Sequence, residues 1–282
     1  MKKIITEELL DNFQLYMREG EKSPSTIKKY MCDVRKLQKY AHGKEITKKM
    51  MVEYKAYLIE ICHYKERSAN SFLVAANSFL QFAGWNDLVV KSYKIQCEMF
   101  CPDERYLTKE EYKKLVNTAK ALGKHRLAMI LQTICATGIR VSELKYVTVQ
   151  TVEKGIVNVR NKGKSRRVFL PKKLRIILKK YIKEHTIAEG CVFITSKGKA
   201  VERSNIWREM KAICEKANVD QSKVFPHNLR HLFAQNYYAL EKDIVKLADI
   251  MGHNNIETTR IYIKSTEAEH LKLLEQMGLV ID

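Results

Sequence analysis

The sequence predicts a mainly α-helical chain of two domains, with a small antiparallel sheet in the second domain. Two observations lead to this prediction. Apolar residues recur at helical spacing, often behind Ser or Thr cap residues, along most of the chain. One stretch, residues 147–171, is instead rich in β-branched residues and is divided by glycines. With 282 residues and 45% hydrophobic content, the chain can form one large or two ordinary domains and is no disordered tail.

The first domain, residues 1–92, is predicted to contain four helices. Each helix has an apolar face at positions three and four apart, behind a residue that can cap a helix N-terminus. The predicted starts are at Thr6, Ser23, Thr47 and Ser68. Gly20 ends the first helix and Gly84 stops the last. Four helices in about 85 residues are typical of a small helical domain.

Residues 93–105 are predicted to form a linker, because they follow no strong period and contain Pro102. The second domain, residues 106–282, opens with a helix whose capping box joins Thr108 to Glu111. A three-stranded antiparallel meander with a basic turn is expected within residues 147–171. Further helices are expected over residues 172–186, 203–217, 226–240, 243–251 and 255–263.

The charge of the chain predicts a polyanionic partner. There are 51 Lys and Arg residues against 32 Asp and Glu, a net charge of +19, which favours nucleic acid over an acidic membrane surface. Residues 1–100 hold 17 basic against 12 acidic residues, and residues 101–282 hold 34 against 20. Eleven of the 14 arginines lie in the second part. Because Arg grips phosphate with a planar fork, this part is expected to hold phosphate in a fixed position.

Several protein classes are excluded. No segment approaches the roughly 18–20 continuous apolar residues of a membrane span. The N-terminal lysines precede no apolar run, so we expect no signal peptide. The seven cysteines contain no CxxC pair, which favours reduced thiols over a disulfide framework or a zinc site. We therefore expect a cytoplasmic protein that binds no membrane.

Arg140 and the segment Phe225–His231 are candidates for anion binding. Arg140 follows the helix break at Gly138 and precedes the next helix, where an anion is favoured; alternatively it is a solvated surface Arg. His227 and His231 are four residues apart, as in a metal pair, but Arg230 stands between them, where a metal site needs a carboxylate. His227 and Arg230 share a helical face that suits phosphate better.

Two more segments have both a functional and a structural interpretation. Residues 250–262 form two helices around Gly252, which would also fit a helix-turn-helix, and Tyr262, one of 14 tyrosines, would then only pack. The basic residues 160–167 at the predicted hairpin tip are either a solvated turn or a mobile cation that enters a groove. Metal-free phosphodiester exchange needs a nucleophile, fixed cations and an acid for the leaving oxygen. These segments together supply all three.

The order Arg, Lys, His-x-x-Arg, His, Tyr resembles the tyrosine recombinase (phage integrase) family, at the size of its Xer-like members. The matching stretches are ATGIRVSEL (136–144), NKGK (161–164), PHNLRHLFA (226–234), MGH (251–253) and TTRIY (258–262). The resemblance covers the second domain, and the first resembles the family's SAM-like core-binding domain. It implies a C-shaped clamp on DNA and a mixed α/β catalytic domain.

The resemblance also implies roles for individual residues. Tyr262 would attack the scissile phosphate and form a 3′-phosphotyrosyl bond. Arg140 and Arg230 would hold the non-bridging oxygens. His227 and His253 would hydrogen-bond the phosphate and assist proton transfer.

The remaining roles concern a lysine acid and a supporting carboxylate. Lys162, at the hairpin tip, would protonate the leaving 5′-oxygen, with Lys164 as the alternative. Glu143 would orient the site from behind. The covalent bond conserves the phosphodiester energy, so the resemblance implies no metal, ATP or other cofactor.

The expected partner is double-stranded DNA with specific core sites. Candidate DNA contacts outside the catalytic set are Lys28, Lys29, Arg35, Lys36, Lys164 and Arg166. Residues 265–282 are expected to form a C-terminal helix, donated to a neighbouring protomer in a tetramer at synapsis, or else packed on its own domain. The free protein would be a monomer or weak oligomer, located in the cytoplasm at the nucleoid.

Two other functions fit parts of the sequence. A type IB topoisomerase-like relaxing enzyme would use the same chemistry, but it gives no reason for the first domain or the exchangeable tail. A non-catalytic helix-turn-helix regulator built on residues 243–262 has no need for Arg140, Lys162 and His227 together. The sequence therefore favours a site-specific recombinase acting through a Holliday junction.

Overall fold

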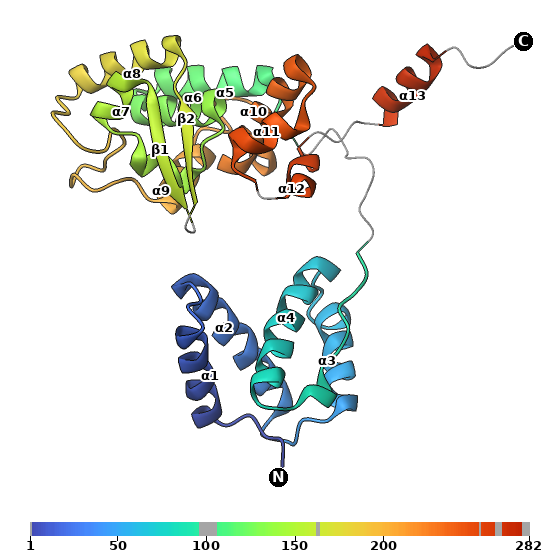
Figure 1. Ribbon diagram of the computed structural model, residues 1–282. Helices are drawn as coiled ribbons and strands as arrows, with labels where there is room; N and C mark the ends of the chain where they lie inside the picture. Colours follow the sequence, from blue (N-terminus) through green and yellow to red (C-terminus); the bar gives the residue numbers. More distant parts are fainter. Residues whose placement is uncertain (1, 96–105, 162–163, 254, 263–266, 278–282) are drawn as a thin grey trace, which may run out of the picture. The chain divides into compact units, whose positions relative to one another are not determined.

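The computed structural model describes residues 2–95, 106–161, 164–253, 255–262 and 267–277. The chain divides into two compact units, Met1–Cys97 and Glu98–Asp282. This division lies within the predicted linker, residues 93–105, of which 96–105 are outside the described residues. Each unit has its own hydrophobic core, so each is considered by itself (Figure 1).

The first unit consists of four α-helices and a short 3-10 helix. The helices are α1 (Glu7–Glu19), α2 (Pro24–Ala41), α3 (Lys48–Glu60) and α4 (Glu66–Phe82), followed by η1 (Asn86–Leu88). Three of the predicted caps are present, because the side chains of Thr6, Ser23 and Thr47 each accept a backbone N–H three residues on. The prediction that Ser68 opens α4 was wrong. Lys65 is the N-cap and makes no side-chain cap bond, so Ser68 is already inside the helix.

The core of the first unit is aromatic and lies between the helices. Phe13 of α1 and Phe79 of α4 are fully buried and meet edge to face, with ring centroids 5.3 Å apart. Tyr54 of α3 is also fully buried. The chain after α4 is tied back by Asn77, whose side-chain amide bonds both the N–H and the carbonyl of Val90. These contacts account for a separate helical domain.

The second unit is built on a buried central helix. This helix, α6 (His125–Thr137), is contacted by α5 (Lys109–Ala121), α8 (Lys172–Glu184) and α10 (Pro226–Glu241). The capping box predicted at Thr108 and Glu111 is present at the start of α5. The helix predicted over 203–217 is shorter, because α9 ends at Lys211 and turns follow.

The sheet has two strands in the described part of the chain, and the predicted three-stranded meander was wrong. Strand β1 (Ile156–Asn161) pairs antiparallel with β2 (Lys164–Phe169), with Asn161 opposite Lys164. The stretch predicted as the first strand is the helix α7 (Val149–Lys154) after the 3-10 helix η3 (Val141–Tyr146). A reciprocal cap between Thr148 and Thr151 starts α7. Local capping therefore overrides the β propensity of three valines.

The chain ends in a series of short helices. They are α11 (Ile244–Met251), α12 (Ile256–Arg260) and α13 (Glu267–Gln276), with η4 (Gln221–Lys223) before α10. The helix predicted over 265–282 is described for residues 267–277, where Leu271, Leu274 and Met277 are exposed. No helix in these described ranges is long and apolar enough to cross a membrane. They also contain no group of three His, Cys, Asp or Glu side chains placed to hold a metal ion.

Candidate active site

The site begins where α6 ends. Gly138 closes α6 in a left-handed conformation, with φ at +64°. A Cβ at this position would lie 2.5 Å from Cδ1 of Phe233, so both the backbone angle and the packing require glycine. The next residues turn into η3, and this places Arg140 at the N-cap of that helix. The sharp turn therefore fixes the direction in which Arg140 leaves α6.

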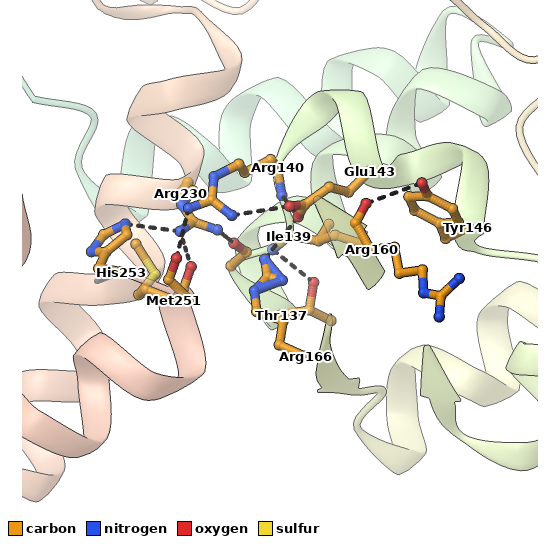
Figure 2. A network of polar contacts seen from close by, with 12 residues as sticks. Thr137, Ile139, Arg140, Glu143, Tyr146, Arg160, Arg166, Arg230, Met251 and His253 are labelled. Atoms are coloured by element: carbon orange, nitrogen blue, oxygen red, sulfur yellow. Dashed lines mark hydrogen bonds and ion pairs between the residues drawn. The ribbon is translucent and has the colours of Figure 1, made fainter. Parts of the chain in front are cut away.

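Arg140 is held by a buried carboxylate and a distant turn (Figure 2). Its Nη1 donates to Oε1 of Glu143 at 3.0 Å, and its backbone N–H donates to Oε2 at 2.9 Å. Its Nη2 donates to the carbonyl of Gly252 at 3.1 Å, across 112 residues of sequence. The side chain keeps 32% of its surface exposed, whereas Glu143 keeps 2%. A guanidinium held on one edge and open on the other can receive an anion.

Arg230 is the second cation, and it is almost completely buried. Its guanidinium donates to the carbonyl of Gly138, to the carbonyl of Met251 at 2.5 Å and to Nε2 of His253 at 3.1 Å. Burial lowers the pKa of Arg230 to about 10, and the nearby charge of Arg140 acts in the same direction. Among the described residues, these bonds use three of its five N–H donors.

His253 lies on the turn after α11 and is held at both ring nitrogens. Nδ1 is 2.9 Å from Oγ1 of Thr259, and Nε2 faces Arg230. Because Arg230 can only donate, Nε2 is an acceptor and the ring is the neutral Nδ1–H tautomer. Desolvation, together with the positive charges of Arg230 and Arg140, lowers the pKa of His253 to about 4. His253 is therefore uncharged at neutral pH.

Tyr262 lies among three histidine rings. Its ring stacks on His253 with centroids 5.5 Å apart, and the centroids of His227 and His231 are 5.4 and 5.1 Å away. The side chain is buried, with 4% of its surface exposed. Its other neighbours are apolar residues of α10 and α11. The structure thus gathers the predicted nucleophile with both predicted histidines.

His227 lies at the exposed edge of this cluster. It is in the first turn of α10 after Pro226, as the sequence predicts. Partial desolvation lowers the pKa of His227, and the charges of Arg230, Arg203 and Arg140 also lower it. A phosphate beside His227 would act in the opposite direction.

His231 belongs to the site through contacts that the sequence did not reveal. It is buried, its Nε2 is 3.3 Å from the carbonyl of Ile261, and its ring stacks on Tyr106 with centroids 3.8 Å apart. Burial lowers the pKa of His231 to about 4. The carbonyl belongs to the residue just before Tyr262, so His231 fixes the backbone that carries the predicted nucleophile. One available signal was its position four residues after His227, but that spacing suggests a metal pair.

The structure gives no side-chain position for two of the predicted lysines. Lys162 lies outside the described residues, and the side chain of Lys164 is also not among those described. The ordered strands β1 and β2 lead to and from this turn. The strands on either side of Lys162, the predicted acid, are therefore described, but Lys162 itself is not.

Arg166 lies against Glu143, with most of its side chain buried. It was predicted as a DNA contact at the basic hairpin, but 13% of its side chain is exposed and Nη2 lies 2.7 Å from Oε2 of Glu143. Burial lowers its pKa, which the carboxylate of Glu143 partly offsets. Figure 2 shows Arg140 and Arg166 converging on Glu143.

The predicted DNA contacts of the first unit lie on α2. Lys28 is exposed. Lys29 pairs with the buried carboxylate of Asp33 within the same helix. Lys36 donates to the hydroxyl of Tyr64 at 2.9 Å. Arg35, also exposed, is 3.3 Å from Glu7. The pair between Arg35 and Glu7 is exposed on both sides, and such pairs are weak, so Arg35 can exchange Glu7 for phosphate.

Comparison with known proteins agrees with this geometry. Residues 105–269 match the phage integrase family, and residues 10–87 match the N-terminal SAM-like domain of phage integrases. Tyrosine recombinase XerA of Pyrococcus furiosus is 31% identical over 96% of this chain and 93% of its own. Tyrosine recombinase XerD of Staphylococcus saprophyticus is 30% identical over 96% and 97%. Neither alternative function, the relaxing enzyme or the regulator, finds support among these relatives.

Solved structures give the same answer for the fold. A XerA recombinase crystal structure is 25% identical and aligns over 98% of this chain and 100% of its own, with a TM-score of 0.53. XerH bound to difH after cleavage aligns over 94% and 83% at 20% identity, with a TM-score of 0.73. A lambda integrase tetramer on a Holliday junction aligns over 93% and 78% at 14% identity, with a TM-score of 0.74. The chain therefore belongs to the phage integrase family of tyrosine recombinases.

Proposed function

We propose that this tyrosine recombinase cuts and rejoins DNA at specific sites through a covalent bond to Tyr262. The Tyr262 hydroxyl oxygen attacks the scissile phosphorus, and the bond from phosphorus to the 5′-oxygen breaks. A 3′-phosphotyrosyl bond and a free 5′-hydroxyl result. A 5′-hydroxyl from a partner strand then attacks the phosphotyrosine, which restores a phosphodiester and frees Tyr262. Two such exchanges proceed through a Holliday junction.

One observation carries the proposal, the convergence of Arg140, Arg230, His253 and Tyr262 from segments far apart in sequence. Arg140 offers an exposed guanidinium edge, and among the described residues Arg230 uses three of its five N–H donors. Fixed cations of this kind stabilise the negative charge that builds up on the non-bridging oxygens. His227 is suited to hydrogen-bond the phosphate and pass protons. His253 is proposed to do the same once its Nε2 takes up a proton and becomes a donor, and Lys162 is proposed to protonate the leaving oxygen.

The partner proposed for this site is duplex DNA carrying specific core sites. The net charge of +19 supports an affinity that falls steeply with salt. The related lambda integrase is a tetramer on its junction, and we propose the same assembly during strand exchange. The exposed Leu271 and Leu274 of α13, with the exposed Met277 directly after it, support donation of this helix to a neighbouring protomer. Chromosomal DNA as substrate would place the protein in the cytoplasm, at the nucleoid.

Covalent trapping tests the proposal. The probe is a pool of duplexes with randomised cores, each nicked so that the short fragment carrying the free 5′-hydroxyl diffuses away after cleavage. The wild-type protein is expected to form denaturation-resistant adducts, and sequencing the trapped DNA identifies the core site. On that site, Tyr262→Phe should bind with unchanged Kd and form no adduct. Tyr16→Phe, a tyrosine change at an exposed position of α1 in the first unit, should trap like wild type. Adducts formed by Tyr262→Phe would refute Tyr262 as the nucleophile.

A further inference from the structure

We infer that Arg166 is a positioning residue that holds the phosphate-binding Arg140 in place through Glu143 and Gly252. The inference rests on the proposed function, because it assigns a role within that site. It replaces the sequence-based expectation that Arg166 contacts DNA. Three features of its surroundings lead to this conclusion.

The first feature is a carboxylate shared between two arginines. Glu143 is 2% exposed and makes three contacts: Oε1 with Nη1 of Arg140, and Oε2 with both the backbone N–H of Arg140 and Nη2 of Arg166. A buried carboxylate with a single partner would be free to rotate toward that partner. Because Arg166 holds Oε2 at 2.7 Å, the plane of the carboxylate is fixed, and this fixes where Arg140 lies.

The second feature is a close contact with the turn before His253. A Cβ added to Gly252 would lie 2.5 Å from Cδ and 2.6 Å from Nε of Arg166. The carbonyl of the same glycine accepts from Nη2 of Arg140 at 3.1 Å. Arg166 thus packs against the residue that Arg140 binds, and it connects β2 to the end of α11. Removing its side chain would free both ends of the Arg140 contact at once.

The third feature is that the burial of the charged Arg166 side chain is unfavourable for folding. Its Nε and Nη1 are buried and have no hydrogen-bond partner among the residues described. A buried guanidinium with unpaired N–H groups lowers the stability of the fold, so we expect its charge to have another role. With 13% of the side chain exposed, Arg166 is not a surface arginine open to the DNA backbone. Its partner Glu143 instead leads directly to Arg140.

Arg167 provides a matched control. It is the next residue of β2, so its side chain leaves the opposite face of the strand, and it is exposed. The two changes, Arg166→Gln and Arg167→Gln, remove the same charge from adjacent positions. A surface arginine that contacts phosphate contributes to affinity and to its salt dependence. A positioning arginine contributes to the rate on bound DNA.

The experiment separates affinity from rate on the trapped core site. We measure Kd between 50 and 200 mM salt, and the single-turnover trapping rate at saturating DNA. Arg166→Gln is expected to lower the saturated rate about 10- to 100-fold with Kd and salt slope unchanged. Arg166→Lys, which retains the charge beside Glu143, should recover part of that rate. Arg167→Gln should leave the saturated rate at the wild-type value.

A double-mutant cycle completes the test. Glu143→Gln and Arg166→Gln act through the same contact, so their combined effect on the rate should be smaller than the product of the two single effects. Multiplicative effects would overturn the inference, as would an Arg166→Gln protein that weakens binding and lowers the salt slope by about 1 while keeping its saturated rate. Failure of the wild-type protein to trap DNA would instead refute the proposed function.

Discussion

His231 should make the second unit sensitive to mild acid, and His231→Gln should remove part of that sensitivity. Burial lowers the pKa of His231 to about 4 in the folded chain. In the unfolded chain an ordinary histidine has a pKa of about 6.5. The unfolded state therefore binds more protons between these values. The stability linked to His231 is complete above pH 6.5 and is lost as the pH falls toward 4.

The size of the effect follows from the two pKa values. The two pKa values differ by about 2.5, which at about 1.4 kcal/mol per pH unit corresponds to about 3–4 kcal/mol over the whole interval. Glutamine can still donate to the carbonyl of Ile261 but does not titrate. It loses the ring contacts with Tyr106 and Tyr262, so His231→Gln should be less stable at pH 7 by about 1 kcal/mol.

Urea unfolding at a series of pH values measures the difference. The sequence has two tryptophans, so a Trp85→Phe background leaves Trp207 of α9 as a fluorescence probe of the second unit. Wild type should lose more unfolding free energy than His231→Gln between pH 7 and 4.5. Other groups, His253 among them, titrate in both proteins and cancel in the comparison. Equal losses in the two proteins would refute the assignment of a neutral, buried His231.

Two further substitutions test the residues that support the site, Gly138 and Thr259. Gly138→Ala should lower the unfolding free energy by about 2–4 kcal/mol, because it combines a left-handed φ with a Cβ 2.5 Å from Phe233. Gly123→Ala, with φ at +67° and no atom within 4 Å, should lose only about 1 kcal/mol, and equal losses would contradict the steric part. Thr259→Val removes the acceptor for Nδ1 of His253 and should slow trapping roughly 10-fold at unchanged Kd. Thr259→Ser keeps the hydroxyl and should trap at the wild-type rate.

The helices could be predicted because their signals are local. Thr6, Ser23, Thr47 and Thr108 each cap the helix that the sequence places behind them. The errors arose where local signals compete. The valines at 147, 149 and 152 favour a strand, but the paired threonines around them start a helix and Gly155 ends it. Helix α4 begins at Glu66 without a side-chain cap bond, so no cap residue marked its start.

The site was predictable as a set of residues and not as a set of contacts. Arg140, Arg230, His253 and Tyr262 stand in motifs with fixed spacing, and the structure brings them together. The partners of those residues depend on tertiary contacts that no local pattern encodes. Arg140 donates to the carbonyl of Gly252, 112 residues away in sequence. Glu143 accepts from Arg166, which lies on strand β2, 23 residues further along the chain. Backbone carbonyls carry no sequence signature, so contacts of this kind cannot be read from residue types.

The direction of the pKa shifts gives the site a common electrostatic character. The pKa values of His227, His253, Arg166 and Arg230 are all lowered, each mainly by desolvation and further by neighbouring guanidinium groups. Glu143 is the carboxylate set against three arginines there, so positive charge is in excess. An entering phosphodiester supplies the missing negative charge and favours the protonated form of each group. His227 and Arg230, whose protonated forms are disfavoured in the free protein, would therefore bind the scissile phosphate more strongly. Binding of a phosphodiester therefore accounts for the clustering of Arg140, Arg166 and Arg230 at this site.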